Sequence, residues 1–80
     1  MDAKRKKAKD FLKQSTLHEF HRVTKQAKLT RRQGRIAYYL FRKGMYRYQI
    51  AAELGNCEEV VRNETAVIYD RVINVLDRYN

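Results

Sequence analysis

The chain has 80 residues, of which 44% are hydrophobic and 34% charged, with no Pro and only three Gly. This length fits one domain, and the composition is typical of a helix-rich globular protein rather than a disordered one. No apolar run approaches the ~20 residues of a membrane span, and the single cysteine, Cys57, excludes an internal disulfide. We therefore expect a cytoplasmic protein without a membrane segment.

The net charge of +9 is concentrated in the first half of the chain. Residues 1–35 carry twelve Lys and Arg against three acidic residues, whereas residues 36–80 carry six of each. The most basic segment lies within residues 1–9, which we interpret as an N-terminal arm preceding one domain at 10–80. Such an arm favours a polyanionic partner, most often nucleic acid. A solubilising charged tail is the alternative.

The first predicted helix covers residues 10–27. Apolar and small residues recur there at intervals of three or four, which places them on one face of a helix. They are Leu12, Thr16, Phe20, Val23 and Ala27.

The second predicted helix begins after Thr30 and ends at Lys43–Gly44. The Thr30 hydroxyl can cap the free amides, and Gln33, three positions on, can bond back to the Thr30 amide, which is a capping box. Gly44 can adopt the left-handed conformation that ends many helices.

The third predicted helix covers 47–54 and is followed by Gly55. The fourth begins after Cys57 and extends to Tyr79, with an apolar stripe along its length. Its last half extends beyond what the third helix can cover. That half therefore needs either the N-terminal helix of the same chain or a second copy. The expected fold is all-α: a small four-helix domain with a central helix-turn-helix and a long C-terminal helix.

The segment "AAELGNCEEVV" has the residues that a helix-turn-helix requires. Ala51 allows a close crossing, Gly55 permits a positive φ in the turn, and Ile50, Leu54 and Val61 join the two helices. The spacing resembles the helix-turn-helix of sigma-factor region four and of LuxR-type regulators. The matching positions are Leu29, Thr30, Arg32, Gln33, Gly44, Ile50, Ala51, Leu54, Val61 and Arg62.

The resemblance implies that the helix after Cys57 enters the major groove of double-stranded DNA. Arg62 and Asn63 then read base edges, since Arg suits guanine and Asn suits adenine. Glu59 either accepts from cytosine or, with Glu58, stabilises the positive end of the helix. Residues expected to contact phosphates are Thr30, Arg31, Arg32, Arg35 and Arg47, together with Lys4, Arg5, Lys6 and Lys7 of the arm.

The resemblance and the uncovered apolar stripe both predict a homodimer. The residues expected at its interface are Ile68, Val72, Val75, Leu76 and Tyr79.

Other chemistry is not indicated. His18 and His21 have a spacing that can bind metal, but no further ligand lies nearby in the sequence, and Cys57 has no visible catalytic partner. We expect no enzyme activity, no metal and no cofactor.

The sequence therefore predicts a small bacterial DNA-binding transcriptional regulator associated with the nucleoid. The alternative is a sigma-like adaptor that contacts RNA polymerase or another regulator through its acidic fourth helix. From Glu58 onward, five acidic residues face three basic ones.

Overall fold

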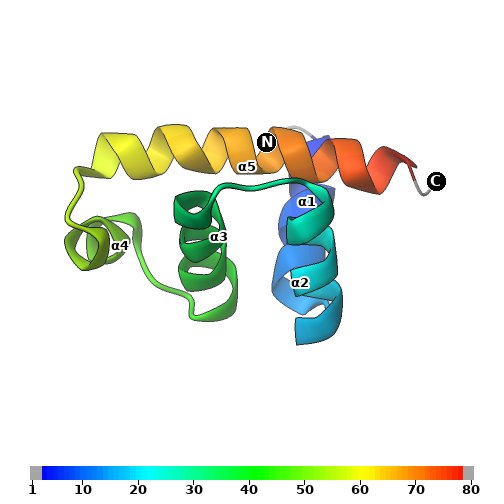
Figure 1. Cartoon of the computed structure of the whole chain (residues 1–80), viewed down its shortest axis with the longest axis horizontal. Helices are drawn as coiled ribbons and strands as arrows, with labels where there is room; N and C mark the ends of the chain where they lie inside the picture. The colour runs from blue at the N-terminus through cyan, green and yellow to red at the C-terminus, as the bar shows by residue number, and fades with distance from the viewer. Residues whose placement is uncertain (1–2, 79–80) are drawn as a thin grey trace.

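A computed structural model describes residues 3–78 as an all-α domain, as predicted (Figure 1). Five α-helices and one π-helical turn, with no strand, make up this part of the chain. The elements are α1 (Ala3–Gln14), α2 (Leu17–Gln26), α3 (Arg31–Ala37), η1 (Tyr38–Arg42), α4 (Arg47–Leu54) and α5 (Glu58–Arg78). None of the helices described is long and apolar enough to cross a membrane.

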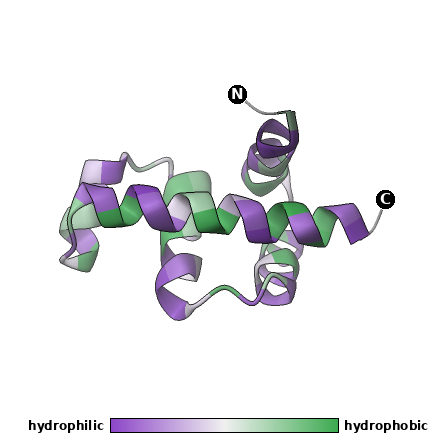
Figure 2. Cartoon of the chain, turned by 90° about the horizontal axis from the view of Figure 1, so that it is seen from above, coloured by the Kyte–Doolittle hydropathy of each residue, from purple (hydrophilic) through white to green (hydrophobic). Residues whose placement is uncertain are grey.

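Helix α5 runs along the whole molecule, and the other helices pack against it. Helix α4 lies at its first turns, α3 near its middle, and α1 and α2 along its second half (Figure 1). Apolar and polar residues alternate along α5, and α1 and α2 lie on opposite sides of it (Figure 2). The fully buried side chains of α5 are those of Val61, Ile68 and Val72. This helix therefore supplies one wall of the core along the molecule's full length.

The helix predicted over residues 10–27 is instead two helices, α1 and α2, separated at Ser15 and Thr16. Thr16 is the N-cap of α2: its hydroxyl accepts from the Glu19 amide at 3.1 Å, and the Glu19 carboxylate accepts from the Thr16 amide at 3.3 Å. This capping box begins a new helix where the predicted apolar stripe continued. The corner lets the two helices flank α5.

The segment interpreted as a basic arm is helical from Ala3 onward. Ala8 and Leu12 of α1 are completely buried, so the core extends into residues 3–9. The boundary expected between residues 9 and 10 therefore does not separate two structural units.

The local signals around the helix-turn-helix are confirmed. Thr30 caps α3, its hydroxyl accepting from the Gln33 amide at 3.1 Å while the Gln33 side chain accepts from the Thr30 amide at 3.0 Å. Gly44 and Gly55 have positive φ values of 66° and 69°. Helix α4 has the predicted bounds, and Ile50 and Val61 are fully buried between α4 and α5. The predicted second helix continues from α3 into η1, where the Lys43 amide donates to the Tyr38 carbonyl.

The apolar stripe of α5 is covered within the single chain. Ile68 and Val72 are fully buried and Val75 is 3% exposed, because α1 and α2 pack on that half of the helix. Leu76 is half-buried against the same core, and Tyr79 lies outside the described residues. The stripe is thus covered without a second copy of the chain, and the homodimer expected through these side chains stays a prediction.

Candidate nucleic-acid interface

The first turns of α5 expose the residues predicted to read bases. Glu59, Arg62 and Asn63 are all exposed, whereas Val61, between them in sequence, faces the core. The Arg62 guanidinium lies 3.9 Å from the Glu59 carboxylate, in an i,i+3 pair in which both side chains are largely exposed. Such a pair stabilises the fold by little. Arg62 can therefore leave Glu59 at small cost when another acceptor is available.

Arg47 lies on one side of this exposed face. It is the first residue of α4 and borders a shallow cleft with Glu58, Glu59 and Arg62 of α5, which has a volume of about 260 Å³. The helix-turn-helix thus brings together Arg47 and Arg62, fifteen positions apart in the sequence. The cleft also contains two carboxylates, which sit at the positive end of α5 and are stabilised by it.

Thr30, Arg31 and Arg32 lie beside α5 at the first turn of α3. They border another shallow cleft, with Gln33 and Glu64, and both arginines are exposed. The Thr30 hydroxyl is already the acceptor of the α3 cap, so its role in this structure is to hold the α3 terminus. Cationic side chains from α3 and from α4 therefore border different parts of the same half of α5.

Arg35 lies one turn further along α3, away from the α4–α5 cleft. It is exposed and lines a cleft of about 420 Å³ that also includes Lys43 and the rings of Tyr38 and Tyr39. The Lys43 ammonium lies 5.9 Å and 5.8 Å from the centres of those two rings. Arg35 and Lys43 thus extend the basic surface of α3 toward η1.

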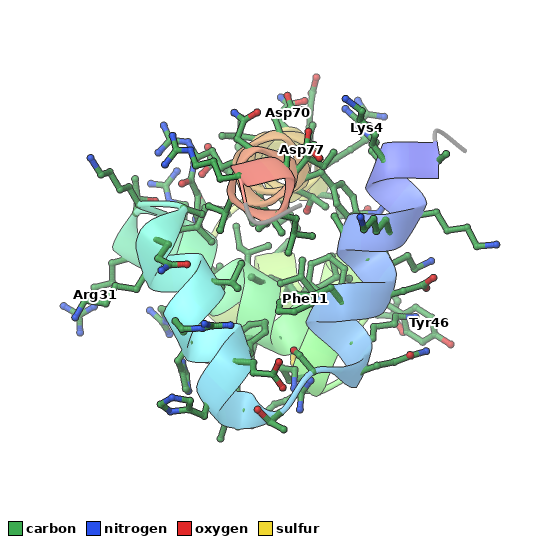
Figure 3. The ribbon with its side chains drawn as sticks, turned by 90° about the vertical axis from the view of Figure 1, so that its right-hand side faces the viewer. Lys4, Phe11, Arg31, Tyr46, Asp70 and Asp77 are labelled. Carbon is green, nitrogen blue, oxygen red and sulfur yellow. The ribbon has the colours of Figure 1, made fainter. Side chains whose placement is uncertain are left out.

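Two basic residues of α1 face the second half of α5 instead. Lys4 lies 3.6 Å from Asp77 and Arg5 lies 3.9 Å from Asp70, with the Arg5 guanidinium also 5.8 Å from the centre of the Tyr69 ring. Lys4 and Arg31 lie on opposite sides of α5 (Figure 3). Along the axis of α5, Asp70 lies about 12 Å beyond Arg62, because an α-helix rises 1.5 Å per residue. The structure therefore separates these two cations from the helix-turn-helix, while Lys6 and Lys7 are exposed on α1.

An exposed pair of tyrosines, Tyr46 and Tyr48, flanks Arg47. Tyr46 is 67% exposed and Tyr48 is 59% exposed. Their rings are nearly parallel, at 7°, with centres 5.9 Å apart. They are surface residues and contribute little to the core. The alternation Tyr-Arg-Tyr at a helix start is the sequence signal that marks them.

The remaining candidate chemistry gains no support from the geometry. His18, His21 and Cys57 are exposed, and no group of three or more His, Cys, Asp or Glu residues in the described chain could hold a metal ion.

No family model matches the chain, and no curated protein or solved structure is significantly similar to it.

Proposed function

We propose that this chain is a small bacterial DNA-binding protein of the helix-turn-helix type that acts as a transcriptional regulator. One observation carries the proposal: exposed arginines of α3 and α4 border the exposed first half of α5. A helix that enters the major groove needs such cations beside it, since phosphates line both edges of the groove. Arg31 and Arg32 supply them from α3, and Arg47 supplies one from α4.

In this arrangement α5 is the helix that enters the major groove, and it contributes more to sequence preference than to binding affinity. Arg62 and Asn63 reach base edges, and Arg62 exchanges its contact with Glu59 for a guanine. The carboxylates of Glu58 and Glu59 repel phosphates, so most of the affinity comes from the flanking arginines and from the exposed lysines of α1.

The experiment is a salt titration of binding to duplex DNA. Neutralising about five phosphates makes log K fall with log salt at a slope of about −4.5. Single-stranded DNA of the same length is the control and should bind more weakly with a shallower slope. A flat salt dependence of duplex binding, or tighter binding of the single strand, contradicts the proposal.

The second candidate is an adaptor that contacts RNA polymerase or another regulator through α5. Its support is the exposed acidic residues of that helix, of which Glu58 and Glu59 share a cleft with Arg47. Reversing both charges, Glu58→Lys with Glu59→Lys, separates the candidates. A DNA-binding protein should then bind duplex DNA more tightly, whereas an adaptor should lose its protein partner without gaining affinity for DNA.

A further inference from the structure

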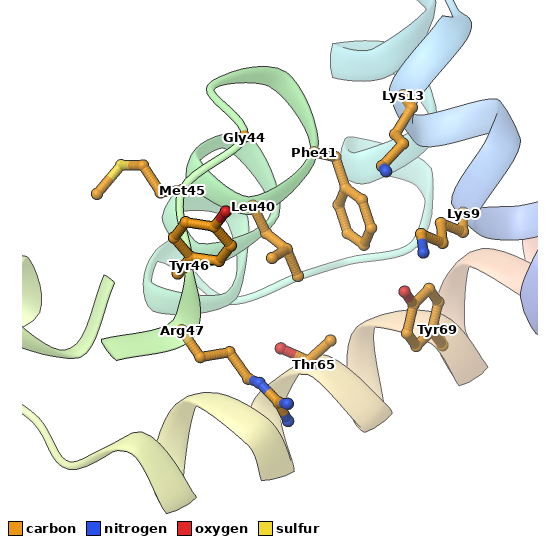
Figure 4. A pocket seen from close by; sticks show the side chains of 10 residues that line it. All are labelled: Lys9, Lys13, Leu40, Phe41, Gly44, Met45, Tyr46, Arg47, Thr65 and Tyr69. Carbon is orange, nitrogen blue, oxygen red and sulfur yellow. The ribbon is translucent and has the colours of Figure 1, made fainter. Parts of the chain in front are cut away.

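A second kind of cleft lies on the side of the molecule where α1, η1, α4 and α5 meet (Figure 4). Its volume is about 520 Å³, the largest of the clefts described above. That volume falls in the range of roughly 300–1,000 Å³ that is usual for small-molecule sites. We call it the aromatic cleft, and its walls include Leu40, Phe41 and Tyr69.

The walls of the aromatic cleft are apolar and held in place by the core. Phe41 is 6% exposed, and its ring meets that of Tyr69 edge to face, with centres 5.7 Å apart. Leu40 and Phe41 both belong to the π-helical turn η1. Such turns are rare and occur frequently at functional sites. An apolar ligand would therefore meet a surface that is already formed.

All the charged side chains that line the aromatic cleft are cationic. Lys9 and Lys13 approach from α1 at one end, and Arg47 lies at the other end, with the apolar walls between them (Figure 4). No carboxylate belongs to the lining. The α4–α5 cleft differs in this respect, because its arginines share it with two glutamates.

Tyr69 adds a polar group beside the lysines. Tyr69 lines the cleft together with Lys9 and Lys13 (Figure 4). Burial raises the pKa of Tyr69 above its usual value of 10.0, an effect that the nearby Arg5 opposes. The hydroxyl therefore stays protonated at neutral pH and can donate a hydrogen bond to an anion.

We propose that the aromatic cleft binds a small organic carboxylate with an apolar, ring-containing body. The body packs against Leu40, Phe41 and Tyr69, and the carboxylate binds between the ammonium groups of Lys9 and Lys13. An apolar surface favours a ligand with rings, and the cationic end selects a carboxylate over a neutral group of the same shape. Arg47 lines both this cleft and the α4–α5 cleft, whereas Arg62 and Asn63, the proposed base-reading residues, do not line this one.

The test is an NMR titration of the isotope-labelled protein with three compounds. The probe is 2-naphthoate, the neutral analogue is 2-naphthalenemethanol, and inorganic phosphate tests whether charge alone is sufficient. Naphthoate should shift the amide signals of Leu40, Phe41 and Thr65, which lie at the cleft. The neutral alcohol and phosphate should each bind these positions about tenfold more weakly, which corresponds to about 1.4 kcal/mol.

Two matched double variants test where the carboxylate of the ligand binds. Lys9→Gln with Lys13→Gln should weaken naphthoate binding about tenfold. Lys6→Gln with Lys7→Gln makes the same charge change on exposed residues of α1 that do not line the cleft, and should leave binding unchanged. None of these residues is part of the fully buried core, so both variants should fold.

Several outcomes overturn the proposal. They are an absence of saturable shifts at ligand concentrations on the order of 1 mM, shifts centred away from the cleft, equal binding of the neutral alcohol, equal binding of phosphate, and equal losses in the two lysine variants.

Discussion

The guanidinium of Arg42 donates a hydrogen bond of 2.7 Å to the backbone carbonyl of Ser15. The same nitrogen, Nη1, also lies 3.0 Å from the carbonyl of Lys13 and 3.2 Å from that of Leu12. The last carbonyls of a helix have no partner within it, and those of Leu12 and Lys13 lie in the last turn of α1, which Ser15 follows. One cation therefore serves two carbonyls of the helix end and one just beyond it. The guanidinium also lies 5.7 Å from the centre of the Phe20 ring on α2. Arg42 therefore fixes the corner between α1 and α2.

Replacing Arg42 by Met should destabilise the domain. Met retains an apolar stem but leaves the three carbonyls without their donor, and hydrogen bonds from a charged group contribute about 1.5–3 kcal/mol. We expect a loss of about 2–3 kcal/mol in the free energy of unfolding, measured by urea denaturation. Ser15→Ala is the control, because its hydroxyl has no hydrogen-bond partner in the described structure and its carbonyl is kept. Equal losses in the two variants would contradict this account.

Replacing Lys28 by Gly should stabilise the domain. Lys28 has a φ of 54°, a left-handed conformation that strains a residue with a Cβ atom. Its backbone carbonyl accepts from Arg71 at 2.9 Å, a contact that does not need the Lys28 side chain. Glycine relieves the strain, so the free energy of unfolding should rise by about 1 kcal/mol. Lys28→Ala removes the same charge while keeping the Cβ atom, and should show no such gain in thermal unfolding.

The stability contributed by Glu19 should depend on pH. Hydrogen bonds from the side chain and backbone of Thr16 hold the pKa of Glu19 below its usual value of 4.5. A carboxyl whose pKa is lowered in the folded state contributes stability that is fully present above 4.5 and is lost as the pH falls through the folded pKa. Glu19→Gln cannot ionise, yet its amide oxygen can still accept from Thr16.

The difference in unfolding free energy between the original chain and Glu19→Gln should therefore be greatest near neutral pH. It should shrink as the solution is acidified below 4.5. Other carboxyls titrate alike in both proteins and cancel in the comparison. A difference that stays constant between neutral and acid pH would show that ionised Glu19 does not strengthen the capping box.

The proposed DNA interface makes different predictions for Arg62 and Arg47. Arg62→Ala should reduce the preference for the best sequence by about 1–3 kcal/mol, because a base contact is lost. Arg47→Gln should weaken binding to every sequence alike and reduce the magnitude of the salt slope by about 0.9, because one phosphate contact is lost. Competition binding against a randomised duplex separates the two effects. If both variants alter sequence preference equally, the assigned roles are wrong.

The features that the sequence predicted well depend on residues close together in the chain. The Thr30–Gln33 capping box spans three positions, and the positive φ values of Gly44 and Gly55 follow from single residues. The break at Thr16 was missed although Glu19 gives the same signal as Gln33. The apolar spacing from Leu12 to Phe20 is also that of one continuous helix, which concealed the break.

The parts of the site that could not be predicted depend on how distant segments meet. Arg42 reaches the end of α1 across about thirty positions, and no local pattern marks its partner. From the sequence alone, Lys4 and Arg5 are interpreted as part of a basic arm. Only the packing of α1 against α5 places Asp77 and Asp70 beside them. The aromatic cleft combines side chains of four elements, so its existence follows from the fold rather than from a motif.

The packing of α1 against the second half of α5 also determines when the core can close during synthesis. Helix α1 has its main partner in α5, which is made after all the other described helices. The part of the core that α1 and α5 share therefore closes only after Val72 and Val75 have been made. Such long-range closure slows folding compared with contacts between neighbouring helices. A ribosome that stalls within α5 would leave the nascent chain with an open core, even though the helix-turn-helix residues had already been made.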